Sequence, residues 1–383
     1  MSEPTGRHRS AETNGTAELV EAGPTRCPVS IGPGCLNLLG ERLNGRRAQL
    51  IADEYVLDLH GRRLPAELAR SALHIPRGEQ AKSWAVLGDL LERLAASGLD
   101  RDCVLVTFGG GATCDVGGLA AALHLRGMDV IHLPTTLLAQ VDASVGGKTA
   151  INLRAGKNLA GRIHAPSAVL CDTHWLSTLS PEEWRSGLGE VLKSAILSGE
   201  ADLHALEKAA DDLAAHEPQA SAATVARCVR HKARVVTADE QERGERELLN
   251  LGHTYGHAIE QLFGYGEIPH GVAVAAGIGA ALEASEHFGV LTDSGLRDRV
   301  AQLAGRLGLP GSIADLQSLN NAPGLSGQAL VEAMGTDKKA RAGVLRFIGI
   351  ESPGSGRFGL AWDPATVAEL LDRSLGKQLP SNR

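Results

Sequence analysis

The chain has few aromatic residues and no excess of positive charge. Aromatic residues make up 3% of the 383 residues, and the formal net charge at pH 7 is −7. Proteins that bind nucleic acids use clustered basic residues to contact phosphates and aromatic rings to stack on bases. The scarcity of both argues against a DNA or RNA partner.

The chain also lacks paired cysteines and long hydrophobic runs. No two of its six cysteines form a C-x-x-C pair, which favours reduced thiols in the cytoplasm over a disulfide framework or a zinc ribbon. No apolar run approaches the roughly 20 residues that a membrane-spanning helix requires. The N-terminus has no apolar segment typical of a secretory signal. We therefore expect a cytoplasmic protein with no membrane partner.

Shorter apolar segments are abundant, and their pattern changes at about residue 180. Before that point they alternate with helical patterns and glycine turns, which predicts a largely parallel sheet covered by helices. Four buried strands are predicted, at 48–53, 102–108, 128–134 and 167–172. After residue 180 the patterns are mostly helical, and Ser180 with Glu183 forms a capping box at the first of these helices.

This change of pattern predicts two domains. We expect an α/β domain with a mostly parallel sheet, then a mainly α-helical domain, with the active site in the cleft between them. The polar composition of the first residues predicts a disordered leader. The expected segments are the leader at 1–25, the α/β domain at 26–180, the helical domain at 181–373 and a flexible tail at 374–383.

A glycine-rich turn follows the predicted strand at 102–108. Gly109, Gly110 and Gly111 let the backbone approach a ligand closely, and a helix start beside them can bind a pyrophosphate. The spacing is not G-x-G-x-x-G, so a tight turn required by packing explains these glycines as well. Both interpretations stay open on this motif alone.

A second glycine-rich segment, 141–149, ends like a nucleotide P-loop. That motif needs glycine where this chain has Asp142, and it needs a preceding strand, so we reject an ATPase. What remains is Lys148 on a glycine-rich turn, joined shortly afterwards by Lys157 and Asn158. Two lysines close to flexible backbone favour an anionic, phosphorylated substrate over merely solvated side chains.

His253 and His257 lie four residues apart in the predicted helix "LNLGHTYGHAIE". This spacing puts both imidazoles on the same helix face. They are two ligands of one metal, one ligand and a proton carrier, or two polar residues on a solvated face. The pair alone does not decide between the three.

Five motifs together give the chain a family resemblance. These motifs occur in the order in which the family has them. The chain thereby resembles the 3-dehydroquinate synthases and the wider sugar-phosphate cyclase family over nearly its whole length after the leader. The central 29-residue motif is highly specific. The motifs are "PRGEQAK" (76–82), "LPTTLLAQVDASVGGKTAINLRAGKNLAG" (133–161), "GLGEVLK" (187–193), "LNLGHTYGHAIE" (249–260) and "DKK" (337–339).

The resemblance implies two cofactors, NAD in the α/β domain and a divalent metal, Zn²⁺ or Co²⁺. It places the metal on Glu190, His253 and His270, a set that leaves positions open for substrate as a catalytic zinc site requires. His257 is then not a ligand but a polar or proton-handling group next to the ligands. The residues implied around NAD are Asp53, Glu79, Lys82, Gly110, Gly111, Asp115, Thr135, Thr136, Leu138, Lys157 and Thr178.

The implied reaction converts 3-deoxy-D-arabino-heptulosonate 7-phosphate to 3-dehydroquinate and phosphate. It proceeds by transient oxidation, β-elimination of phosphate, re-reduction, ring opening and aldol closure, with the leaving phosphate as the hypothetical base. Asp142, Asn158 and Asn250 are expected to orient hydroxyl groups. The substrate cations are expected to be Lys148, Lys193, Lys232, Arg246, Arg126 and one of Lys338 or Lys339. The resemblance also implies a homodimer.

Some residues depart from the usual pattern of the family and leave alternatives open. Val272 stands where glutamate is usual, and the glycine loop has small residues, with Leu119 in place of phenylalanine. An aminodehydroquinate synthase is therefore the nearest alternative. Valiolone-type cyclases, metal-dependent polyol dehydrogenases and a non-catalytic NAD-binding protein are more distant ones. The acidic stretch 238–247 is interpreted as solvated, apart from Arg246.

Overall fold

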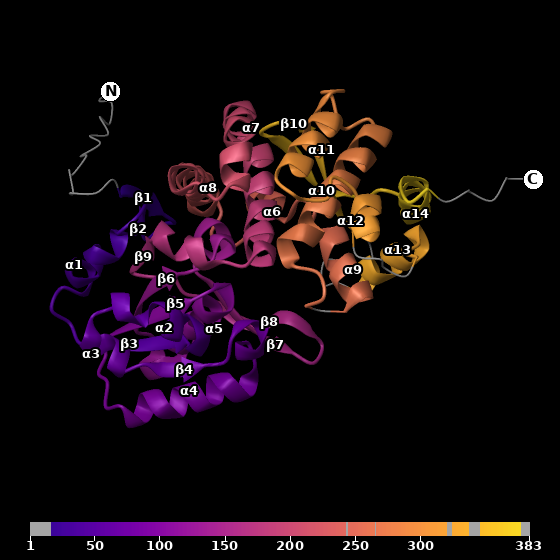
Figure 1. Ribbon diagram of the computed structural model, residues 1–383. Coiled ribbons are helices and arrows are strands. Elements are labelled where there is room, and N and C mark those ends of the chain that lie inside the picture. The colour runs from indigo at the N-terminus through magenta and orange to yellow at the C-terminus, as the bar shows by residue number, and fades with distance from the viewer. Residues whose placement is uncertain (1–16, 243, 265, 320–323, 337–344, 377–383) are drawn as a thin grey trace, which may run out of the picture.

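The computed structural model describes residues 17–242, 244–264, 266–319, 324–336 and 345–376, and it has two parts that follow one another along the chain (Figure 1). The first is built around a seven-stranded sheet, and the second is mostly helical. The strands are β1 Glu18–Ala22, β2 Cys27–Ile31, β3 Ala48–Asp53, β4 Leu73–Ile75, β5 Val104–Gly109, β6 Asp129–Pro134, β7 Lys148–Leu153, β8 Gly156–Ile163, β9 Ala168–Cys171, β10 Phe347–Ser352 and β11 Ser355–Leu360.

Helices accompany the sheet and make up most of the second part. Those of the first part are η1 Cys35–Leu38, α1 Leu39–Leu43, α2 Glu54–His60, η2 Gly61–Arg63, α3 Ala66–Arg70, η3 Gly78–Ala81, α4 Trp84–Ala96, α5 Gly111–Leu123, η4 His124–Arg126, η5 Ala139–Ala143 and η6 Thr173–Thr178. Those of the second are α6 Pro181–Ser198, α7 Glu200–Ala214, α8 Pro218–Ala238, η7 Glu245–Asn250, α9 His253–Phe263, α10 His270–His287, α11 Leu296–Arg306, α12 Ile313–Leu319, α13 Gly327–Thr336 and α14 Pro364–Ser374.

The sheet has the order β1-β2-β9-β6-β5-β3-β4, and all its pairs are parallel except β1 with β2. Successive residues of a strand point to opposite faces. Ile51 accordingly packs with helices α4 and α5 on one face, whereas its neighbours Leu50 and Ala52 pack with the residues around α1 and α3 on the other. The predicted parallel α/β sheet is confirmed, and β3 has the predicted bounds.

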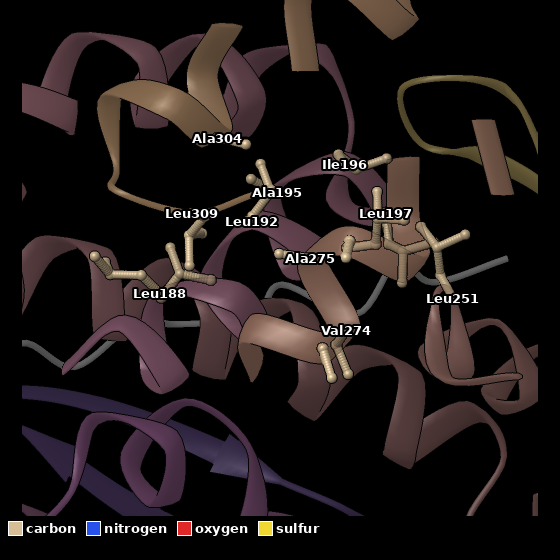
Figure 2. Close-up of a cluster of buried hydrophobic side chains, with 14 of the residues drawn as sticks. Leu188, Leu192, Ala195, Ile196, Leu197, Leu251, Val274, Ala275, Ala304 and Leu309 are labelled. Carbon is tan, nitrogen blue, oxygen red and sulfur yellow. The ribbon is translucent and has the colours of Figure 1, made fainter. Parts of the chain in front are cut away.

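The helical domain is organised around α6 and α10, which cross within its core (Figure 2). Apolar residues of α6, among them Leu188, Leu192 and Ile196, pack with Val274 and Ala275 of α10. The predicted capping box at Ser180 and Glu183 begins α6, with both of its hydrogen bonds present. None of the described helices is long and apolar enough to cross a membrane.

The N-terminal hairpin differs from the expected disordered leader. Strand β1 lies within 1–25, pairs with β2 and packs against α8 of the helical domain. The backbone N–H of Gly23 donates to the hydroxyl of Thr237 at 3.1 Å, and Arg230 forms an ion pair with Glu18. A polar composition hid this strand, because the helix that it packs against lies some 200 residues away in the chain.

Candidate active site

Three metal-ligand side chains converge at the start of two helices and the middle of a third. Glu190 lies on α6, while His253 and His270 are the first residues of α9 and α10. The Nε2 atoms of both histidines lie 3.7 Å from Oε1 of Glu190. One ligand atom from each of the three residues lies within 4.8 Å of the other two.

Close helix crossing brings Glu190 and His270 together. A Cβ atom at Gly189 would lie 1.9 Å from the carbonyl oxygen of Gly271, and one at Gly271 would lie 1.8 Å from that of Ser186. Any side chain at either glycine would force α6 and α10 apart. The glycines beside the two ligands therefore let their backbones approach closely enough to share one ion.

Both histidines present the same ring nitrogen to Glu190. Nδ1 of His253 faces the carbonyl oxygen of Leu251 at 3.2 Å, and Nδ1 of His270 faces Oε2 of Glu260 at 3.3 Å. An oxygen acceptor keeps the proton on Nδ1, which leaves the lone pair of Nε2 for a metal. The hydrogen bonds thus select the tautomer that a metal site needs.

The chemistry of this group fits a divalent cation. Oε1 of Glu190 is buried and has no hydrogen-bond partner among the described residues, while the ammonium of Lys193 forms an ion pair with Oε2. A buried oxygen without a partner is costly, and a cation relieves that cost. Two imidazoles and a carboxylate are also a ligand set of catalytic zinc.

His257 lies near this group, beside both histidines. Its ring centroid is 5.4 Å from that of His253 and 6.0 Å from that of His270. It shares a second cluster of possible ligand atoms with Glu260 and His270. The polar or proton-handling role that the resemblance implies for His257 stays a prediction.

A group of cations adjoins the metal ligands. Lys232 of α8 donates to the backbone carbonyl and to the carboxylate of Asp142. Burial alone would raise the pKa of Asp142, but the ammonium groups of Lys232, Lys193 and Lys148 hold it well below its usual range. Arg246 is fully buried and donates to the carbonyl oxygen of Glu240 at 2.6 Å.

Glu242 is a member of this group that the sequence did not reveal. Its carboxylate forms an ion pair with Lys148 and accepts a hydrogen bond from the amide of Asn250 at 2.9 Å. Burial opposes its ionisation, yet the hydrogen bond and charge of Lys148 lower the pKa of Glu242 below its ordinary value. The interpretation of 238–247 as solvated apart from Arg246 is therefore wrong at Glu242.

The residues expected around NAD gather at the carboxyl edge of the sheet. Asp53 ends β3, Gly110 and Gly111 follow β5, and Thr135 with Thr136 follows β6. In open parallel sheets this edge is where ligands bind. Leu138 comes directly before η5, while Thr178 at the end of η6 bonds to the ring of His60 at 2.8 Å.

Hairpin β7–β8 connects this edge to the helical domain. The ammonium of Lys82 donates to Asp115 at 2.5 Å and to the side chain of Asn158 on β8. The neighbouring Lys157 forms an ion pair with Glu260 of α9 at 3.0 Å. Glu79 accepts a hydrogen bond from Asn152 of the same hairpin.

Some of the expected site residues are not brought together. Arg126 lies beyond the C-terminal end of α5, whereas Gly111 begins that helix, so about 20 Å of helix separates the two. Arg126 is exposed and has a positive φ of 66°. Lys338 and Lys339 lie outside the described residues.

Comparison with known proteins identifies both halves of the chain. A family model of the 3-dehydroquinate synthase N-terminal domain matches residues 72–186, and the model of its C-terminal domain matches 187–340. The 3-dehydroquinate synthase of Paracoccus denitrificans (strain Pd 1222) is 40% identical over 365 residues, which cover 93% of this chain and 98% of the relative.

Solved structures of sugar-phosphate cyclases share the fold. A 2-deoxy-scyllo-inosose synthase complexed with carbaglucose-6-phosphate, NAD⁺ and Co²⁺ has a TM-score of 0.82 and 25% identity, covering 94% of this chain and all of the other. The 2-epi-5-epi-valiolone synthase of Streptomyces hygroscopicus subsp. jinggangensis 5008, with NAD⁺ and Zn²⁺ bound, has a TM-score of 0.79 and 26% identity, covering 97% and 99%. Cofactors of both predicted kinds thus occur in the same architecture.

Proposed function

Because the chain belongs to the 3-dehydroquinate synthase family, we propose that this site converts 3-deoxy-D-arabino-heptulosonate 7-phosphate to 3-dehydroquinate and inorganic phosphate. The observation that carries the assignment to these residues is the convergence of Glu190, His253 and His270 beside buried cations. The reaction belongs to the shikimate pathway of aromatic amino acid biosynthesis.

The two cofactors supply chemistry that side chains lack. When bound, NAD accepts and returns a hydride, and a divalent metal on Glu190, His253 and His270 acts as a Lewis acid toward oxygen ligands. The family's reaction returns the hydride within each turnover, so no net redox change is expected. The residues at the carboxyl edge of the sheet hold NAD, with Asp53 on a ribose.

The charge of the site suits a substrate with one carboxylate and one phosphate. Four cations, Lys148, Lys193, Lys232 and Arg246, are accompanied by the carboxylates of Glu190, Asp142 and Glu242. A carboxylate and a phosphate carry together nearly three negative charges at pH 7. These four cations and a divalent ion supply the positive partners that such a substrate requires.

The cations also assist loss of the phosphate. Lysine and arginine side chains fixed around a departing phosphate stabilise the charge that develops on it. The burial of Lys193, Lys232 and Arg246 strengthens that effect. Asn250, Asn158 and Asp142 orient hydroxyl groups by hydrogen bonding. His257 handles a proton next to the ligands, and the departing phosphate is itself the base of the elimination.

Incubation of the purified protein with the heptulosonate phosphate, catalytic NAD and Zn²⁺ tests the proposal. Equal release of phosphate and 3-dehydroquinate, without accumulation of NADH, is expected. Turnover of only the amino analogue would assign an aminodehydroquinate synthase instead. Steady NADH formation from a simple polyol such as glycerol would assign a dehydrogenase.

The homodimer and the cytoplasmic location belong to the same proposal. Sedimentation of the purified protein is expected to give twice the chain mass of 40.1 kDa. Fractionation of the source cells is expected to recover the activity with the cytoplasmic proteins. A monomer or a membrane-associated activity would contradict the respective part.

A further inference from the structure

We propose that Glu260 is a positioning residue that fixes the metal ligand His270 and ties it to Lys157, so that binding of metal and binding of NAD reinforce one another. This inference rests on the proposed function, because it takes the metal site and the NAD site from there. Glu260 lies two helical turns after His253 on α9, which puts both on one face of the helix. Only 3% of Glu260 is exposed.

The two carboxylate oxygens of Glu260 contact residues of different domains. Oε2 faces Nδ1 of His270 at 3.3 Å, while Oε1 faces the ammonium of Lys157 at 3.0 Å. Nε2 of His270 is turned toward Glu190, 3.7 Å away. The imidazole of His270 is thus held between two carboxylates. Glu190 lies on the side of the metal, and Glu260 fixes the orientation of the ring.

The two histidine ligands differ in what orients them. Nδ1 of His253 faces the backbone carbonyl of Leu251, two residues earlier, so its support is part of the same local turn. His270 depends on Glu260, a charged side chain with its own partner on hairpin β7–β8 of the α/β domain. A change at the hairpin therefore reaches His270 through Glu260 and leaves the support of His253 in place.

Adjacent residues of strand β8 link both sites. Lys157 contacts Glu260, and Asn158 contacts Lys82, which in turn binds Asp115 at the glycine turn. Lys157 thus contacts the metal side and Asn158 the NAD side, so a single hairpin joins the two. Figure 1 shows this hairpin extending from the sheet toward α9.

A bridge of this kind makes the coupling between the ligands reciprocal. NAD that fixes the hairpin fixes Lys157, and through Glu260 it holds His270 ready for the metal. By thermodynamic linkage, the metal must then strengthen NAD binding by the same factor. NAD and the metal ion both favour the same position of the hairpin.

Substitution Glu260→Gln tests the inference, since it keeps the shape of the side chain and removes its charge. Chelator competition on the whole protein is expected to show Zn²⁺ binding weakened about 10- to 100-fold. The visible absorption bands of bound Co²⁺ are expected to shift as the ligand field at His270 changes. Glu260→Asp, which retains the charge, is expected to recover part of the Zn²⁺ affinity.

The coupling is measured by titrating NAD with and without Zn²⁺. In the unmodified protein Zn²⁺ is expected to tighten NAD binding, and in Lys157→Met this gain is expected to disappear. The Lys157 variant also carries the test if Glu260→Gln fails to fold, because Lys157 is only half-buried. Glu283→Gln is the matched control, since Glu283 lies 13 residues along α10 from His270, about 20 Å away.

Unchanged Zn²⁺ affinity and an unchanged Co²⁺ spectrum in folded Glu260→Gln would overturn the positioning role. Equal effects of Zn²⁺ on NAD binding in Lys157→Met and the unmodified protein would overturn the bridge. None of these readouts requires turnover. Failure to release phosphate from the heptulosonate phosphate would count against the proposed function alone. The two binding measurements would still test the positioning role of Glu260.

Discussion

The ammonium group of Lys232 binds both the carboxylate and the backbone carbonyl of Asp142, and it thereby fastens α8 to the turn after β6. Lys232 is 9% exposed, so its charge is partly removed from water and depends on this partner. Two further lysines near Asp142 share its negative charge. The pair is at once part of the proposed substrate site and a link between the two domains.

Replacing Lys232 by Met should therefore reduce both stability and activity. A partly buried carboxylate that loses its main partner costs on the order of 2 kcal/mol in the free energy of unfolding. Urea unfolding measures this loss. Arg26→Met is the control, because the ion pair of Arg26 with Glu21 is exposed and contributes about 1 kcal/mol or less. Equal losses in the two variants would contradict the role of the pair.

Gly189→Ala should separate the helices that carry Glu190 and His270. Its Cβ would lie 1.9 Å from the backbone oxygen of Gly271, a contact that neither helix can relieve by rotating a side chain. We expect a loss of about 3 kcal/mol in unfolding free energy together with weaker Zn²⁺ binding. Gly88→Ala in α4 meets no atom within 4 Å, and there alanine should stabilise the helix by about 1 kcal/mol. A Gly189 variant that behaves like Gly88→Ala would contradict the close crossing.

The strands that the sequence predicted are those whose residues are buried on both faces. Strand β3 keeps the predicted bounds 48–53 because a continuous apolar run has no other stable place than between helix layers. At hairpin β7–β8 the sequence predicts only a glycine-rich turn, since the polar residues of the two strands lack a two-residue period. Contacts with Lys82 and Glu260 hold it, and no local pattern encodes such contacts.

The residues of the candidate site likewise divide into those that the sequence indicates and those that only tertiary contacts reveal. The metal ligands Glu190 and His270 are 80 residues apart, so only the family resemblance could join them before the structure did. Glu242 and Glu260 resemble ordinary surface acids in the sequence, but in the structure Glu260 is buried and Glu242 half-buried, each beside a lysine from hairpin β7–β8. A signal for Glu260 did exist, because it shares a helix face with His253 at a spacing of seven residues.

Removal of the metal should abolish turnover reversibly. Treatment with a chelator is expected to stop phosphate release, and Zn²⁺ or Co²⁺ should restore it. The metal should also stabilise the fold, by about 4 kcal/mol when its free concentration is 1,000 times the dissociation constant. Glu190→Gln should show neither restoration nor stabilisation, because it removes a charged ligand. Full activity in the chelator-treated protein would refute the metal's part in the reaction.

Lys148→Ala should abolish turnover while NAD binding stays nearly intact. Lys148 lies with Glu242 and Asn250 in the cation group, and its ion-pair partner Glu242 is not among the residues expected to hold NAD. Loss of a charged substrate contact should lower kcat/KM at least about 100-fold. Phosphate release and NAD titration measure the two effects. Lys208→Ala, an exposed residue of α7, should change neither. An equal loss of NAD binding would refute a substrate role for Lys148.

Buried His132 should make the fold sensitive to mild acid. Burial lowers the pKa of His132 to about 3 from an ordinary value of 6.5, and its Nδ1 bonds to Thr107 at 2.7 Å. Between these values the unfolded chain binds a proton that the folded chain excludes, so stability falls as the pH decreases. His132 should contribute a loss of about 2 kcal/mol between pH 6.5 and pH 5.

Urea unfolding across this pH range measures the effect. His132→Asn should flatten the dependence of stability on pH, because the variant lacks the imidazole that takes up a proton only in the unfolded chain. His287→Asn, at an exposed position of α10, should leave the slope as it is. Identical slopes in the His132 variant and the unmodified protein would contradict the burial argument.

The attachment of β1 to α8 has a consequence for how the chain is completed during synthesis. Glu18 and Arg230 are 212 residues apart, a stretch that a ribosome needs roughly 10 to 40 s to produce. Until then the first strand has no helix to receive it, although the rest of its sheet has already emerged. Docking of the first strand therefore cannot precede synthesis of the helix that bears Lys232, so the N-terminal edge of the sheet is among the last parts of the α/β domain to be covered.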